Sequence, residues 1–193
     1  MFDFSDIRIR KGKGNRVQVD NTLKYPLIGI GREGAVFKIS PEKCVKMFHD
    51  PKRAKREFEA LQRGSKSALF PRLYEAGENY VVMEYIEGIT LDKAIKKGDL
   101  TTDLIHKMIH MLKEMKNLQF TKVNFAVKHA IITNNGDIKL IDHTDSFVIN
   151  KPYPTRLLRL LRENGKLERF LNKVKEIDEQ MFENWKQNIP QYL

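Results

Sequence analysis

The spacing of apolar residues changes along the chain from an alternating pattern to a helical one. Ile7, Ile9, Val17 and Val19 alternate with polar residues on either side of a glycine-containing segment at 11–15, which predicts a β-hairpin. Further short β-rich segments, separated by turn residues, lie at 25–31, 35–40, 44–48, 71–77 and 80–86. The first part of the chain is therefore predicted to form a mostly antiparallel sheet.

Helical spacing interrupts this β-rich part once and dominates the rest of the chain. Helices are predicted at 52–62, 91–97, 102–118, 155–163 and 166–186, and a hairpin is predicted at 130–142 around an Asn-Asn-Gly-Asp turn. Strands first and helices afterwards favour an α+β fold of two lobes. We expect a single domain over residues 1–193, with an N-terminal β-lobe at 1–87 and a short helical C-terminal lobe at 88–193.

Composition limits the kinds of protein that this chain can be and the kinds of partner that it can bind. The 193 residues carry a formal net charge of +10, which suits a polyanionic partner such as nucleotide phosphate, nucleic acid or an acidic membrane surface. Cys44 is the one cysteine, so an intrachain disulfide framework and a cysteine-rich zinc site are excluded. No segment has the apolar length of a signal peptide or a membrane span, and we expect a cytoplasmic protein. The apolar stripe of the tail helices is interpreted as core, with a membrane-surface helix as the alternative.

A glycine-rich segment points to phosphate binding. Gly29, Gly31 and Gly34 have the G-x-G-x-x-G spacing, and the residues that follow are β-branched and aromatic, so the loop is predicted to join two strands. A dinucleotide-binding fold would need a helix there. Glycines in a strand–turn–strand let backbone amides approach phosphate oxygens. Lys46 follows on a predicted strand and Glu57 on a predicted helix. Glu59 is an alternative partner for Lys46, because the sequence does not determine which face of the helix points toward the lysine.

In this order and spacing the chain resembles the protein-kinase superfamily, in particular small bacterial serine/threonine protein kinase-like proteins with a degenerate catalytic loop. The resemblance implies a two-lobed kinase-like fold that binds ATP with Mg²⁺ or Mn²⁺. It implies that Lys46 contacts the phosphates, that Glu57 pairs with Lys46, and that Met83 is the gatekeeper of the adenine pocket. The residues implied to bind the nucleotide are Ile28, Gly29, Gly31, Gly34, Val36, Lys46, Met83, Glu84 and Ile86.

The catalytic loop departs from the family pattern. The hairpin that ends at Asp142 places this residue at the metal-binding aspartate, with His143-Thr144 in place of Phe-Gly. Counting back places His129 at the second metal position and Asn124 at the catalytic aspartate, and no carboxylate occurs between residues 115 and 136. Loss of a general base slows proton transfer roughly 10²- to 10⁴-fold, so phosphoryl transfer is expected to be weak. Asp145 is interpreted as a turn residue.

Three functions stay open at this point. The first is weak transfer of the ATP γ-phosphate to a hydroxyl acceptor, on a protein or on the chain itself. The second is a pseudokinase that acts as a nucleotide-gated interaction module, which Asn124 favours. The third is a basic nucleic-acid-associated module, and a polyanionic partner would best fit Arg53, Lys55 and Arg56 beside the nucleotide site. The roughly fifty residues after Asp142 lack an Ala-Pro-Glu motif, which counts against an ordinary peptide substrate.

Overall fold

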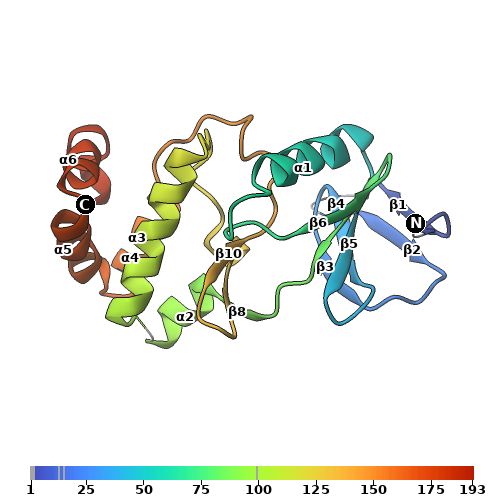
Figure 1. Cartoon of the computed structure of the whole chain (residues 1–193), viewed down its shortest axis with the longest axis horizontal. Helices are drawn as coiled ribbons and strands as arrows, with labels where there is room; N and C mark the ends of the chain where they lie inside the picture. The colour runs from blue at the N-terminus through green and yellow to red at the C-terminus, as the bar shows by residue number, and fades with distance from the viewer. Residues whose placement is uncertain (1–2, 13, 15, 99) are drawn as a thin grey trace. The chain divides into compact units, whose positions relative to one another are not determined.

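The computed structural model describes residues 3–12, 14, 16–98 and 100–193, and the chain divides into two compact units. Unit 1 runs to Ile86 and also takes in Asp142–Thr144, while unit 2 comprises Glu87–Ile141 and Asp145–Leu193. Antiparallel strands make up most of unit 1, and unit 2 is mainly helical (Figure 1). The predicted α+β class is confirmed.

Unit 1 is built on a five-stranded antiparallel sheet with strand order β3-β4-β5-β7-β6. Its strands are β3 (Leu27–Ile30), β4 (Gly34–Lys38), β5 (Lys43–Phe48), β6 (Leu73–Ala76) and β7 (Tyr80–Glu84). A separate antiparallel hairpin, β1 (Ile7–Arg10) with β2 (Gln18–Asn21), confirms the predicted one. Its turn was predicted at 11–15, where Lys13 and Asn15 lie outside the described residues.

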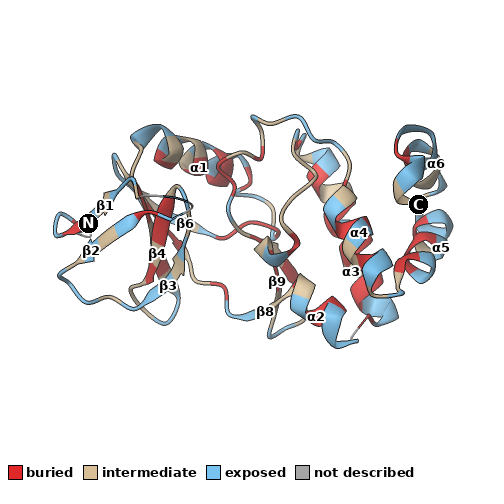
Figure 2. Ribbon diagram, turned by 180° about the vertical axis from the view of Figure 1, so that it is seen from behind, coloured by how far each residue is buried: buried red, intermediate tan, exposed pale blue. Residues whose placement is uncertain are grey.

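The hairpin and the sheet share one hydrophobic core. The residues that meet there alternate along their strands, as expected for strands with one buried face. Figure 2 shows buried residues along β4. The buried residues of this cluster are Phe4, Ile7, Val17, Ala35, Phe37, Val45, Met47 and Val82. The core thus fixes β4, which follows the glycine-rich loop, and β5, which carries Lys46.

One helix, α1 (Pro51–Arg63), packs against β5, β6 and β7 of the sheet (Figure 1). The Asp50 side chain accepts a hydrogen bond from the amide of Lys52, and Pro51 occupies the first helical position, where its missing N–H costs nothing. This start sets the helix register. It turns Glu57 inward with the apolar residues Ala54, Ala60 and Leu61.

Unit 2 combines a small antiparallel sheet of order β10-β9-β8 with helices. The hairpin of β9 (Ala130–Thr133) and β10 (Ile138–Leu140) was predicted, and Gly136 has the positive φ of 81° that its turn requires. Strand β8 (Gly88–Thr90) was not predicted, because three residues give no periodicity, and it pairs with β9. Helices α2 (Leu91–Lys97) and α3 (Thr102–Asn117) follow the prediction.

The tail corrects the sequence prediction. Helix α4 (Thr155–Glu163) was predicted, but the single helix expected at 166–186 is two, α5 (Leu167–Ile177) and α6 (Glu179–Asn188). Asp178 divides them, because its backbone leaves the helical conformation and its side chain caps α6 by accepting from the amide of Met181 at 2.9 Å. The apolar stripe is core, as predicted: Leu157, Leu161, Phe170, Val174 and Trp185 are buried. In the described residues, no helix has both the length and the apolar character needed to cross a membrane.

Candidate functional site

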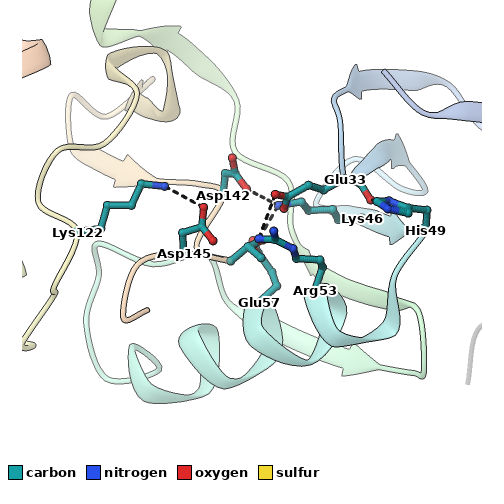
Figure 3. A network of polar contacts seen from close by, with 9 residues as sticks. Glu33, Lys46, His49, Arg53, Glu57, Lys122, Asp142 and Asp145 are labelled. Atoms are coloured by element: carbon teal, nitrogen blue, oxygen red, sulfur yellow. Dashed lines mark hydrogen bonds and ion pairs between the residues drawn. The ribbon is translucent and has the colours of Figure 1, made fainter. Parts of the chain in front are cut away.

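Lys46 is held between two carboxylates in unit 1. Its Nζ lies 3.2 Å from Glu57 Oε2 and 2.7 Å from Asp142 Oδ1 (Figure 3). Lys46 comes from the middle of β5, opposite Val36 of β4, and Glu57 comes from the buried face of α1. Glu59, the rival candidate, is exposed and lies 3.8 Å from Lys55 instead. The register of α1 therefore makes Glu57 the carboxylate that contacts Lys46.

Burial and the neighbouring negative charges shift the pKa of Lys46 in opposite directions. Burial disfavours the charged ammonium, but the negative charges of Glu57 and Asp142, with a hydrogen bond to each, outweigh it and hold the pKa of Lys46 above its usual range. Glu57 is fully buried, whereas 41% of the Asp142 side chain is exposed. The ammonium is thus fixed as a cation with one permanent buried partner and one partner at the surface of unit 1.

The two residues that follow Asp142 anchor it to unit 1. His143 is buried, and its ring stacks on that of Phe70 with a centroid distance of 4.3 Å. Thr144 is also buried, and its hydroxyl donates a 2.7 Å hydrogen bond to Glu57 Oε2, the same oxygen that faces Lys46. Asp142 itself has a positive φ of 65°, a backbone conformation that aspartate tolerates better than most residues. Each residue of this segment therefore contacts the rest of unit 1.

The glycine-rich loop is a strand–turn–strand, as its sequence predicts. A Cβ on Gly34 would collide with the carbonyl of Met47, so the packing of β4 on β5 requires glycine there. At Gly29 and Gly31 a Cβ would meet only ordinary contacts, at 3.6 Å and 3.9 Å, and neither residue has a positive φ. The fold does not require glycine at these two positions, and they leave space for close approach by another molecule.

The tip of this loop is tethered on two sides. The carbonyl of Gly31 accepts from the amide of Val17 at 2.9 Å, and the carbonyl of Glu33 accepts from the amide and Nδ1 of His49 at 3.1 Å and 2.9 Å. The Glu33 carboxylate pairs with Arg53 of α1 at 3.1 Å (Figure 3). Among the described residues, the amides of Arg32 and Glu33 donate to no backbone carbonyl. Two consecutive amides of this kind can donate hydrogen bonds to an anion.

The residues predicted to grip adenine lie at the end of β7. Met83 is buried and pairs with Cys44 of β5. The amide of Glu84 donates to the carbonyl of Arg72 at 2.8 Å, so this donor is used by the fold. The backbone of Ile86 makes no hydrogen bond within the described part of the chain and can offer both a donor and an acceptor. Ile28, on β3, is 44% exposed.

Asn124 has a structural role in unit 2. Its Nδ2 donates to the hydroxyl of Thr155 at 2.8 Å, and its Oδ1 accepts from the amide of Arg156 at 2.9 Å. Both belong to the first turn of α4, whose own cap residue, Pro154, has no side chain able to accept. Asn124 therefore caps α4 from a distant segment. This contact uses both polar atoms of the side chain, and the catalytic role predicted for Asn124 stays a prediction.

The two residues predicted to bind metal belong to different units. His129 ends a short 3-10 helix of unit 2, and its carbonyl accepts from the amide of Ile141 at 2.8 Å, while Asp142 belongs to unit 1. Asp145, interpreted as a turn residue, does form a turn, because its carbonyl accepts from Val148 and Ile149. Its carboxylate also lies 3.2 Å from Lys122. In the described residues, no group of three or more His, Cys, Asp or Glu side chains could hold a metal ion.

Three contacts of this site were not predicted from the sequence. They are the Thr144–Glu57 hydrogen bond, the Phe70–His143 stack and the Glu33–Arg53 ion pair. Each contact joins residues far apart in sequence, so no local periodicity indicates it. The choice between Glu57 and Glu59 did have a signal: Asp50-Pro51 fixes the first turn of α1 and places residues 54, 57 and 61 on one face.

The chain was also compared with known proteins. The sequence pattern of the RIO domain matches residues 35–184, well over half of the 193 residues. The Bacillus subtilis (strain 168) protein YrzF, described as a candidate serine/threonine-protein kinase, is 29% identical over 129 residues. The aligned part covers 64% of this chain and 60% of YrzF, so the chain spans less than two thirds of the length of that relative. With a match of this extent, the chain belongs to the RIO domain family, which is part of the protein-kinase-like superfamily.

Proposed function

We propose that this protein binds ATP with Mg²⁺ or Mn²⁺ and transfers the γ-phosphate weakly to a hydroxyl acceptor, on a protein or on the chain itself. The observation that carries the proposal is the Lys46 ammonium, fixed between the buried Glu57 and the partly exposed Asp142. Lys46 lies on β5, which pairs with β4, the strand that follows the glycine-rich loop. Phosphoryl transfer depends mainly on positioning and charge stabilisation, and a fixed cation supplies both. YrzF, described as a candidate kinase, supports the same class of activity.

The residues present fit the nucleotide and the metal. Gly29 and Gly31 leave room that a Cβ would fill, and the Ile86 backbone has an unused donor and acceptor among the described residues, as an adenine edge needs. Asp142 offers the carboxylate oxygen that Mg²⁺ prefers, and the imidazole of His129 would favour Mn²⁺. A metal held by Asp142 and by phosphate oxygens would neutralise the charge that develops during transfer.

Ligand binding is tested by thermal unfolding. Excess ATP with Mg²⁺ or Mn²⁺ is expected to raise the Tm by roughly 5 °C, since a ligand at a hundred times its Kd adds about 2.7 kcal/mol of stability. Lys46→Ala should abolish this shift. Lys43→Ala is the matched control, because Lys43 lies on the same strand over the ring of Tyr74.

Lys46→Ala leaves Glu57 buried without its cation, so the variant itself can lose stability. Asp142→Asn is the second variant, because Asp142 is partly exposed and its loss leaves the Lys46–Glu57 pair intact. EDTA removes the metal-dependent part of the Tm shift that ATP causes, and Asp142→Asn should reduce this part. A wild-type protein whose Tm does not respond to millimolar ATP would exclude the proposed function.

A catalytically inactive, nucleotide-gated interaction module is the second candidate, and the contacts of Asn124 favour it. Its side chain caps α4 with both polar atoms and would in any case carry no charge to accept a hydroxyl proton. Transfer of radiolabelled γ-phosphate, with Mg²⁺ or Mn²⁺, separates the candidates. Asn124→Asp keeps the acceptor for the Arg156 amide and restores a carboxylate, so it should accelerate any transfer; ATP binding without transfer in either protein would favour the second candidate.

A further inference from the structure

The Glu33–Arg53 ion pair lies where the phosphates of a bound nucleotide would be recognised. Glu33 belongs to the tip of the glycine-rich loop, and Arg53 is in the first turn of α1, four residues before Glu57. Positions four apart share one face of a helix, so Arg53 and Glu57 project from α1 on the same side. Figure 3 shows Arg53 beside the Lys46–Glu57 pair. One helix face therefore carries the carboxylate that fixes Lys46 and the guanidinium that reaches the loop.

This ion pair is not explained by stability. About 30% of each side chain is exposed, at 30% for Arg53 and 31% for Glu33, and ion pairs of this exposure contribute little to folding. The loop tip is already held by backbone hydrogen bonds from Val17 and His49. A carboxylate at a phosphate-binding loop also repels a polyphosphate, so Glu33 is unfavourable for nucleotide binding unless a cation offsets it.

We propose that Arg53 is a phosphate-binding residue that leaves Glu33 and pairs with the terminal phosphate of a nucleoside triphosphate. This inference rests on the proposed nucleotide binding and goes beyond it, because it assigns Arg53 and makes the site selective for the triphosphate. A guanidinium has five donors in a planar fork, which suits bidentate contact with phosphate oxygens. A phosphate with two charges competes well with a single carboxylate for it.

Transfer of Arg53 from Glu33 to the phosphate also gives a reason why the Glu33–Arg53 ion pair joins the loop to α1 and not to the neighbouring strand. With Arg53 drawn from Glu33 to the phosphate, α1 would contact the nucleotide through Arg53 and, through Glu57, the lysine that faces the same phosphates. The pair thus holds the guanidinium at the loop before the ligand arrives, and less side-chain entropy is lost on binding.

Calorimetric titration of the full chain with the Mg²⁺ complexes of ATP and ADP, and with AMP, tests the proposal. Arg53→Ala should weaken ATP about tenfold, ADP less and AMP not at all, as expected for loss of one charged contact to the last phosphate. Lys55→Ala is the matched control, because Lys55 lies two residues further on α1, is 75% exposed and pairs with Glu59. It should bind all three nucleotides as the wild type does.

The double variant Glu33→Gln/Arg53→Ala separates direct contact from simple neutralisation. If Arg53 contacts the phosphate, the double variant stays weak for ATP. Wild-type affinity in the double variant would overturn the proposal, because Arg53 would then only neutralise Glu33, and so would an equal loss for ATP and AMP in Arg53→Ala. A wild type that binds none of the three nucleotides would refute the proposed function itself, whereas unchanged binding by Arg53→Ala would refute this inference alone.

Discussion

At the scale of single residues, the buried carboxylate of Glu57 depends on two donors that differ in kind. Lys46 supplies charge at 3.2 Å, and Thr144 supplies a neutral hydroxyl at 2.7 Å to the same oxygen. Glu57 Oε1 has no hydrogen-bond partner among the described residues, so the loss of either donor leaves the carboxylate poorly satisfied. Thr144 is buried, and its hydroxyl is therefore expected to stabilise the Glu57 carboxylate.

Thr144→Val, which keeps the shape of the side chain, should lower the free energy of unfolding by about 1.5–3 kcal/mol, the contribution of a hydrogen bond to a charged group. Thr144→Ser keeps the hydroxyl and loses one methyl group, which costs about 1 kcal/mol. Urea denaturation of the two variants beside the wild type measures both losses. The role given to the hydroxyl would be wrong if the serine variant were the less stable of the two.

The sequence predicted that Lys46, Glu57 and Asp142 lie close together, but it did not predict the contacts of Asn124. Gly34, Lys46 and Asp142 stand in an order and spacing that few folds require, so their proximity could be inferred. The contacts of Asn124 with the first turn of α4 depend on how residues 31 or 32 positions apart meet, and local patterns carry no such information. Asn124 can therefore be conspicuous in the sequence while the contacts of its side chain with α4 leave no trace in local patterns.

At the scale of elements, the end of α1 is coupled to the segment that carries Asp142. Gly64 ends α1, and a Cβ there would collide with the ring of Phe70. Phe70 in turn stacks on His143, next to Asp142. Periodicity in the sequence predicted the helices, strands and hairpins well. The contact between the end of α1 and His143 passes through Phe70, in a loop without periodicity, so only the three-dimensional structure reveals it.

Gly64→Ala should push the Phe70 ring from its position and destabilise the protein by about 1–3 kcal/mol, as overpacking of a core does. In a Phe70→Leu background the smaller side chain leaves room, so the same substitution should cost clearly less. A double-mutant cycle by urea denaturation measures this coupling. Equal costs of Gly64→Ala in the two backgrounds would show that the helix end and the ring are independent.

A division also occurs at Asp178, where the sequence indicated one long helix. The apolar stripe continues at helical spacing through 166–186, so periodicity alone cannot reveal the break. The side chain of Asp178 caps α6 and lies 3.4 Å from Lys113 of α3. Asp178 is a residue type that favours helix N-caps. Such a residue within an apolar stripe therefore indicates two helices more strongly than the continuous stripe indicates one.

At the scale of the whole molecule, three groups of unit 1 have raised pKa values. Burial raises the pKa of the Cys44 thiol to about 12. Burial and a hydrogen bond to Glu75 raise the pKa of Tyr80 to about 12. Burial lowers the pKa of Lys46, but the carboxylates of Glu57 and Asp142 raise it by more. Each group therefore keeps its proton in the folded state at a pH where the unfolded chain releases it.

The raised pKa values determine how the free energy of unfolding changes at alkaline pH. When the folded state binds more protons than the unfolded state, the free energy of unfolding falls as pH rises, by about 1.4 kcal/mol per pH unit for each such proton. The contributions are complete below the ordinary pKa of each group, the lowest being 9.0 for Cys44, and they are lost as pH rises from there toward about 12. Unit 1 should therefore lose stability steeply in this range.

Urea denaturation followed by circular dichroism at about pH 8 and about pH 11 tests this expectation, since the linkage slope of each group acts only above its ordinary pKa. Cys44→Ala removes one of the three titrating groups, so its stability should fall less with pH than that of the wild type. The single tryptophan, Trp185, lies in unit 2, and its fluorescence should report a smaller alkaline shift than circular dichroism does. Equal pH dependence in the wild type and Cys44→Ala would contradict the assignment of a raised pKa to the buried thiol.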